Sequence, residues 1–160
     1  MDPDADTSRG EYARAKTVVF RMLKVRLRSE KEVVDKLDGK DFPADVIQKT
    51  VRYFRDTGLL DDRLFARGWI ASRLKKPLGF SRIRRELKMK GLSDDIVQEE
   101  CARVADDYDE QESIHALAER RMRQYRTLDR VKAQQRLYAY LARRGFSSGL
   151  IYKVIREIEP

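Results

Sequence analysis

Few side chains in this sequence have the type and spacing that catalysis needs. General acid–base and nucleophilic catalysis usually depend on a histidine that exchanges a proton with a neighbouring group at fixed geometry. His115 is the only histidine and Cys101 the only cysteine. His115 lies on an amphipathic stretch with Ile114 and Leu117, so we interpret it as a partly buried structural residue, and Cys101 as a small core residue. The sequence therefore predicts no catalytic residue and no enzyme.

Two pairs of adjacent carboxylates are the best candidates for a metal site, Asp61-Asp62 and Asp94-Asp95. Carboxylate oxygens suit Mg²⁺, but a site needs further ligands and normally a phosphate substrate. Both pairs fall at predicted helix starts, where aspartate caps free amides and the helix dipole favours negative charge. The sequence also lacks a glycine-rich phosphate-binding loop. We therefore predict helix capping for both pairs, with no metal and no cofactor.

The strongest chemical signal is a basic block over residues 63–91, which carries ten basic side chains and one acid, Glu86. Residues 1–62 carry 13 of each sign, residues 92–119 carry ten acids against one base, and residues 120–160 carry eleven bases against three acids. One acid cannot neutralise ten bases locally, so the block is predicted to face phosphates or carboxylates; a solvated helix face is the alternative.

The predicted binding residues come from this block and from the next basic segment. They are Arg73, Lys75, Lys76, Arg82, Arg84, Arg85, Lys88, Lys90, Arg120, Arg121 and Arg123. Within a helix over residues 81–90, Ile83 and Leu87 are expected to point inward, with the basic side chains flanking this apolar stripe. Trp69 and Phe80 are interpreted as packing residues.

These side chains must be positioned by helices, because the apolar residues recur with helical spacing and no stretch alternates as a strand would. An internal repeat is visible in three leucines, Leu37, Leu87 and Leu141, spaced by 50 and 54 residues. Each is followed after four residues by a helix-ending position and then by a hydrophobe. The helix-ending residues are Asp41, Gly91 and Gly145. Glycine there accepts the left-handed backbone that ends a helix, and aspartate is a poorer substitute.

Composition restricts the remaining classes of protein. The chain has 160 residues, is 39% charged, and carries a formal net charge of +8. A single cysteine excludes an internal disulfide and a metal-binding cysteine pair. Residues 1–10 are acidic and polar, unlike a signal peptide, and no apolar run approaches membrane length. We expect a soluble, cytoplasmic helical protein with an anionic partner.

Three segments resemble the RecX family of recombination regulators: residues 28–37, residues 58–66 and residues 79–92. The second repeat is the most family-specific part, and its element from Leu60 to Ala66, Leu-Asp-Asp-x-x-Phe-Ala, is fairly specific. Motif residues expected to be mainly structural are Leu60, Asp61, Asp62, Phe65, Ala66, Gly79, Leu87 and Gly91. The sequence departs from the family pattern at Asp41, where glycine is expected, and in a diverged third repeat.

The resemblance implies an all-α fold of three tandem three-helix repeats that form an elongated, curved helical array. The expected divisions are a flexible N-terminal tail over residues 1–11 and repeats over residues 12–60, 61–108 and 109–158. It also implies a regulator that binds RecA and the groove of RecA–DNA filaments and inhibits recombinase, ATPase and coprotease activities in DNA repair and the SOS response. Single- or double-stranded DNA is a second candidate partner, whereas no membrane and no small-molecule substrate is expected. The alternatives are a free-standing basic DNA-binding protein and a helical scaffold for another acidic protein.

Overall fold

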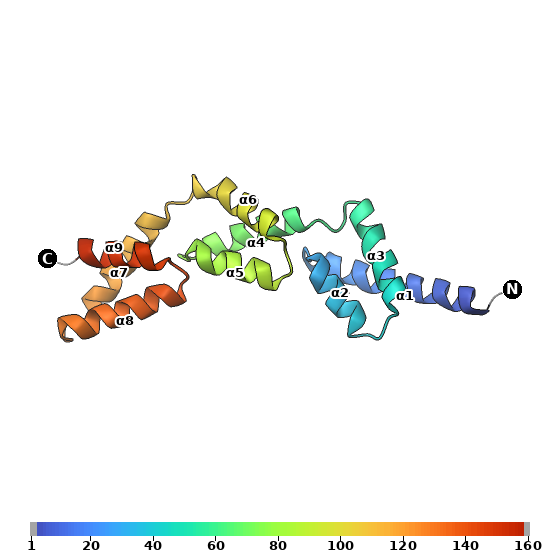
Figure 1. Ribbon diagram of the computed structural model, residues 1–160, viewed down its shortest axis with the longest axis horizontal. Helices are drawn as coiled ribbons and strands as arrows, with labels where there is room; N and C mark the ends of the chain where they lie inside the picture. Colours follow the sequence, from blue (N-terminus) through green and yellow to red (C-terminus); the bar gives the residue numbers. More distant parts are fainter. Residues whose placement is uncertain (1–2, 159–160) are drawn as a thin grey trace. The chain divides into compact units, whose positions relative to one another are not determined.

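The computed structural model describes residues 3–158, and every regular element in that range is an α-helix. The helices, labelled in Figure 1, are α1 (Pro3–Val25), α2 (Glu30–Asp38), α3 (Ala44–Asp56), α4 (Asp62–Leu74), α5 (Phe80–Met89), α6 (Asp94–Ala105), α7 (Glu110–Gln124), α8 (Arg130–Arg143) and α9 (Ser148–Glu157). They follow one another as three groups of three, which confirms the predicted all-α fold of tandem three-helix repeats. No helix within residues 3–158 combines the length and apolar character that crossing a bilayer requires.

The start of the first helix differs from the prediction. The sequence placed that start near Ala13, after a flexible tail over residues 1–11, whereas α1 begins at Pro3. Proline suits the first position of a helix, since its fixed φ fits and its missing amide has no helical partner there. Residues 1–2 of the predicted tail lie outside the described residues.

The described residues form two compact units. One unit contains Met1–Gly68 and Lys88–Ile96, and the other contains Trp69–Leu87 and Val97–Pro160. The division passes through all three helices of the middle repeat. The first and third repeats each lie whole within one unit, so each can be described with its own core.

In the first repeat, α1 contacts both α2 and α3, and α2 contacts α3. Each helix buries the stripe that its helical spacing creates, since side chains three and four residues apart share a face. The aromatic ring of Phe54 lies at the centre and meets Phe20 edge-on at 4.8 Å between ring centroids. The buried core residues are Ala15, Val19, Val33, Leu37, Val46, Ile47, Val51, Phe54 and Leu60.

The third repeat repeats this arrangement, with α7, α8 and α9 in mutual contact. Its buried core residues are Ile114, Leu117, Ala118, Leu137, Leu141, Phe146, Ile151, Val154 and Ile155. The register leucines Leu37, Leu87 and Leu141 are all fully buried, so the internal repeat read from the sequence is confirmed.

The three predicted helix-ending residues all adopt the left-handed backbone. The φ angles are +58° at Asp41, +85° at Gly91 and +88° at Gly145. In the first repeat the Phe42 amide donates to the Leu37 carbonyl at 3.3 Å, and in the third the Phe146 amide donates to the Leu141 carbonyl at 3.3 Å. These bonds close the helix ends and turn the following hydrophobe back toward its core, as predicted.

Beyond ending α8, Gly145 forms a junction with the middle repeat. The Gly79 amide donates to the Arg144 carbonyl at 2.9 Å, so the end of α8 meets the start of α5. A Cβ on Gly79 would collide with the backbone of Gly145 and Phe146, and one on Gly145 would collide with Arg82. The backbones approach this closely only because both positions are glycine.

A corresponding junction joins the end of α5 to the start of α2. The buried Ser29 hydroxyl donates to the Lys90 carbonyl at 2.7 Å, and a Cβ on Gly91 would collide with the Lys31 side chain. The two junctions follow the same rule. The end of α8 meets the start of α5, and the end of α5 meets the start of α2, so the second helices of successive repeats are in contact end to start.

An acid from the following repeat caps the helix start at each junction. Asp62 Oδ1 accepts the Glu30 amide at 2.9 Å, and Glu110 Oε1 accepts the Phe80 amide at 2.9 Å. Asp61 caps its own helix, accepting the amides of Arg63 and Leu64. The predicted capping role of Asp61-Asp62 is confirmed, and Asp62 performs it across a repeat boundary. Burial raises the pKa of Asp62, against the lowering effect of the Glu30 amide.

Glu32 is the most connected carboxylate of the first unit. It completes a capping box with Ser29, and its oxygens accept from Arg26 at 2.8 and 3.0 Å and from Lys90 at 2.7 Å. Burial opposes ionisation, but the hydrogen bonds from Arg26 and Lys90 outweigh it and lower the pKa of Glu32 to about 2. The ionised Glu32 therefore links the loop before α2 to the end of α5.

The close backbone approach predicts that Gly79→Ala is strongly destabilising. The added methyl group collides with backbone atoms that cannot rotate away, so we expect a loss of at least about 2 kcal/mol in the free energy of unfolding. Gly149→Ala is the matched control, because Gly149 lies in α9 with open space around its Cα, and it should gain up to about 1 kcal/mol. Urea unfolding measures the stability of both variants. Equal stability would contradict the close backbone approach at Gly79.

The low pKa of Glu32 predicts a pH-dependent contribution to stability. A carboxylate whose folded pKa is depressed stabilises fully above its unfolded pKa, near 4.5, and loses this effect as pH falls toward about 2. At pH 6 we expect Glu32→Gln to cost about 1–3 kcal/mol, and this difference should be clearly smaller at pH 2.5 and disappear only as the pH falls through about 2. Asp35→Asn, which breaks the exposed Lys31–Asp35 pair, should cost less than about 0.5 kcal/mol at either pH. Urea titrations between pH 6 and pH 2.5 measure the free energy of unfolding of the parent and of both variants. If the difference between the parent and Glu32→Gln does not change with pH, the low pKa of Glu32 is refuted.

Candidate interaction surface

The predicted basic residues of the middle repeat differ in exposure. Lys75, Lys76, Arg84, Arg85 and Lys88 are exposed, whereas Arg73, Arg82 and Lys90 are partly buried. Between them, Ile83 and Leu87 are fully buried, as predicted for the inward stripe of α5. The helix therefore presents its charge on the remaining faces.

Glu86, the only acid of the basic block, collects three donors in the second unit. Its carboxylate accepts from Trp69 Nε1 at 3.0 Å, from Arg73 Nε at 2.5 Å and from Arg82 Nε at 3.0 Å. The Arg73 guanidinium also stacks over the Trp69 ring at 4.4 Å from its centroid. Burial opposes ionisation of Glu86, but these hydrogen bonds outweigh it and hold its pKa below the usual value. Trp69 is thus a half-buried, hydrogen-bonded packing residue.

Two further basic residues are paired with acids outside the block. Lys88 Nζ lies 2.8 Å from Asp94, and Lys90 Nζ lies 2.7 Å from Glu32. The expectation that salt bridges leave the block unneutralised is therefore only partly right, since distant acids reach its ends. Among the side chains that the structure describes, those of residues 9–158, Lys75, Lys76 and Arg85 enter no ion pair.

The structure adds two arginines that sequence reasoning missed. Arg82 Nη1 donates to the Arg143 carbonyl at 3.3 Å, and Arg144 Nη1 donates to the Pro77 carbonyl at 3.3 Å. The Arg-Arg dipeptide directly before Gly145 was the available signal, but nothing in the sequence placed it beside residues 77–82.

Tyr140 ties the predicted Arg121 to the same region. The guanidinium groups of Arg121 and Arg144 lie over its ring, 4.1 and 5.2 Å from the centroid. Arg120 and Arg123 are exposed elsewhere on α7. We define the junction basic surface as the basic residues of α5, α7, the end of α8 and the loop before α5 that make these contacts or adjoin them in the chain. It consists of Lys75, Lys76, Arg82, Arg121, Arg143 and Arg144.

The residues considered for catalysis are structural. His115 Nε2 lies 2.7 Å from Glu157 Oε2 and ties α7 to α9, with the imidazole 29% exposed. Cys101 is fully buried and burial raises the pKa of its thiol, which disfavours the reactive thiolate. Phe80 is buried and meets Tyr108 edge-on at 5.6 Å. Among the described residues no cluster of His, Cys, Asp and Glu is placed to hold a metal ion.

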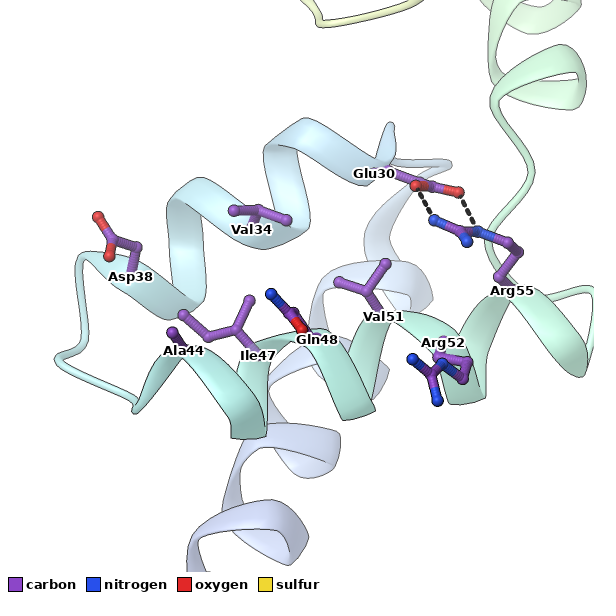
Figure 2. Close-up of a pocket in the computed structure, with 9 residues that line it drawn as sticks. All are labelled: Glu30, Val34, Asp38, Ala44, Ile47, Gln48, Val51, Arg52 and Arg55. Atoms are coloured by element: carbon purple, nitrogen blue, oxygen red, sulfur yellow. Dashed lines mark hydrogen bonds and ion pairs between the residues drawn. The ribbon is translucent and has the colours of Figure 1, made fainter.

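A shallow groove lies between α2 and α3 of the first repeat and is drawn in close-up in Figure 2. Its volume is about 470 Å³, and Val34, Ile47 and Val51 supply its apolar side chains. At one end Arg55 and Glu30 form a double hydrogen bond of 2.7 and 2.6 Å. The groove can receive an apolar side chain, and at this end Arg55 and Glu30 already satisfy each other.

These features define a class: a tandem helical-repeat protein that presents a basic surface at a repeat junction. Three family models match the chain in order, describing the first, second and third three-helix domains of RecX over residues 15–54, 61–99 and 107–155. The regulatory protein RecX of Chlorobium phaeobacteroides strain BS1 is 37% identical, over 88% of this chain and 91% of that protein. The chain belongs to the RecX family of regulatory proteins.

Two further similar proteins support this family assignment. The regulatory protein RecX of Streptomyces lividans is 29% identical over 93% of this chain and 79% of its own. The crystal structure of RecX from Lactobacillus salivarius superposes with a TM-score of 0.81 at 25% identity, covering 93% of this chain and 97% of that one. The three-helix repeats are therefore the shared scaffold.

Trp69 predicts a direct optical readout of the Glu86 cluster. Trp69 is the only tryptophan of the sequence, and its indole N–H donates to the Glu86 carboxylate. Protonation of Glu86 should therefore change the fluorescence emission of Trp69. Because the pKa of Glu86 lies below its usual value, the midpoint should fall below pH 4.5, and Glu86→Gln should abolish the transition while the chain remains folded by circular dichroism. An identical acid transition in both proteins would contradict this geometry.

Proposed function

We propose that this protein regulates RecA by binding RecA and its nucleoprotein filament on DNA. Bound there, it inhibits recombinase, ATPase and coprotease activities, and it acts in the cytoplasm during DNA repair and the SOS response. Membership of the RecX family supports a regulatory role. Its partners are macromolecules, with no membrane and no small-molecule substrate, and it acts by binding without catalysis.

The junction basic surface is the observation that carries the proposal. Its six cations come from four separate segments, and only Arg82 among them is paired with an acid within the described residues. A cluster of like charge that local acids do not neutralise attracts an anionic surface and accelerates encounter with it. A filament of protein and DNA offers both phosphates and carboxylates to such a surface.

A free-standing DNA-binding protein is the second candidate function. Lys75, Lys76 and Arg143 are exposed and have no acidic partner within residues 3–158, so they suit DNA phosphates as well. Binding of this kind weakens steeply with salt and needs no RecA. Comparing affinity for DNA alone with affinity for RecA on the same DNA separates the two functions.

Charge reversal at the junction basic surface predicts loss of inhibition. Titrated into a RecA ATPase assay with single-stranded DNA, the parent should inhibit hydrolysis at amounts well below one per RecA protomer. Lys75→Glu, Lys76→Glu and Arg143→Glu together should weaken this inhibition at least about tenfold, corresponding to about 1.4 kcal/mol. Stability should change little, because these side chains are exposed and unpaired.

The control reverses Arg126, Arg136 and Arg156, three exposed arginines of the third repeat with the same change in net charge. This variant should inhibit within about twofold of the parent. If the two variants inhibit RecA equally, the junction basic surface is only a solvated face and does not contribute to binding. Unchanged hydrolysis with equimolar parent protein would overturn the proposed function itself.

A further inference from the structure

A second groove in the first repeat is lined by cations. It has a volume of about 490 Å³ and lies between α1 and the turn that joins α2 to α3. Arg14, Arg21 and Lys40 supply its charge, and Val18 and Phe42 supply apolar surface. The hydroxyl of Thr17, the sixth lining residue, donates to the Ala13 carbonyl at 3.0 Å. The groove therefore presents three cationic donors and no acid.

Its three cations are not neutralised by the protein. None of them enters an ion pair among residues 9–158, whose side chains the structure describes, and all three are exposed. Residues 9–28 carry seven basic side chains and one acid, although residues 1–62 sum to neutral. The acids that balance the first repeat belong largely to α2, α3 and residues 1–8, so the neutral total conceals a basic groove.

The arrangement of the cations selects a linear polyanion. Arg14 and Arg21 are seven residues apart on α1, which separates them by about 10 Å along the helix axis, and Lys40 lies across the groove. A single carboxylate reaches one of these groups, whereas successive phosphates along a strand can reach all three. Arg14 is also held over the Phe42 ring, 5.7 Å from its centroid, and its guanidinium fork suits phosphate oxygens.

We propose that this groove binds the phosphodiester backbone of single-stranded nucleic acid. The site is separate from the junction basic surface, and the proposal does not depend on the proposed function, since it requires no RecA. Asp41 stands between Lys40 and Phe42 and is the exposed acid closest to the groove in the sequence. Its charge weakens binding, so Asp41→Asn, which tolerates the left-handed backbone, should tighten it.

The test measures fluorescence anisotropy of a labelled oligothymidylate with the full-length chain at two salt concentrations. Arg14→Ala, Arg21→Ala and Lys40→Ala together should weaken binding at least about tenfold. They should also reduce the slope of log affinity against log salt by about 2, as expected for three phosphate contacts on a single strand. The control, Lys24→Ala, Lys36→Ala and Arg52→Ala, removes the same charge from exposed positions of the first repeat outside this groove and should stay within about threefold.

Both variants are measured again in a chain carrying the junction reversals at Lys75, Lys76 and Arg143, so that binding there cannot hide the groove. The groove variant should again lose about tenfold and the control should not. A folded groove variant that binds like the parent in both backgrounds overturns the proposal, as does an oligothymidylate that fails to bind the chain. A labelled glutamate-rich peptide of equal charge provides a further test. If it binds the chain more tightly than the oligothymidylate does, and the three groove substitutions abolish that binding, the ligand is an acidic protein and the proposal is wrong.

Discussion

The structure depends on a close backbone contact at the end of the second helix of a repeat. There a left-handed residue ends the helix, and at both repeat junctions that residue is glycine because a neighbouring chain segment occupies the space of a side chain. The contact is short-ranged and directional, with a hydrogen bond at each junction and a capping acid from the following repeat. The hydrophobic cores stabilise the repeats, whereas this contact fixes how the ends of neighbouring second helices meet. Asp41 occupies the corresponding position of the first repeat and also adopts the left-handed backbone, with a φ of +58°.

The junction also decides which charges meet. Arg82 reaches Arg143 and Arg144 reaches Pro77 because Gly79 and Gly145 allow α5 and α8 to approach. Glu86 then neutralises only part of the charge, and its hydrogen bonds order Arg73, Arg82 and Trp69. A surface assembled from several segments in this way is held in place by backbone packing, which makes its cations better organised than those of an isolated helix. The contact that builds the fold therefore also positions the side chains of the junction basic surface.

The sequence predicted features that depend on local spacing. Helical periodicity, the left-handed positions and capping by Asp61 depend on residues within about two turns of each other, and they agree with the structure. The predicted capping by Asp94-Asp95 was not found, since the Ser93 hydroxyl accepts the Ile96 amide at the start of α6. Features that join distant residues were missed: Asp62 bonds 32 residues back to Glu30, and Arg82 bonds 61 residues ahead to Arg143. The distribution of charge along the chain likewise could not show that Glu32 and Asp94 pair with the ends of the basic block, or that a neutral first repeat contains a cationic groove. Periodicity reveals which face of a helix is buried, but not which other segment covers its ends.

The central proposal is that this chain recognises a RecA–DNA filament more tightly than the same DNA without RecA. The most direct measurement is the anisotropy of the fluorescently labelled chain as it is titrated with RecA assembled on single-stranded DNA with a slowly hydrolysed ATP analogue, in parallel with the same DNA without RecA. Our account predicts binding to the filament at least about tenfold tighter than to the DNA, a difference of about 1.4 kcal/mol. Equal affinity for the two, or binding to neither, would contradict it.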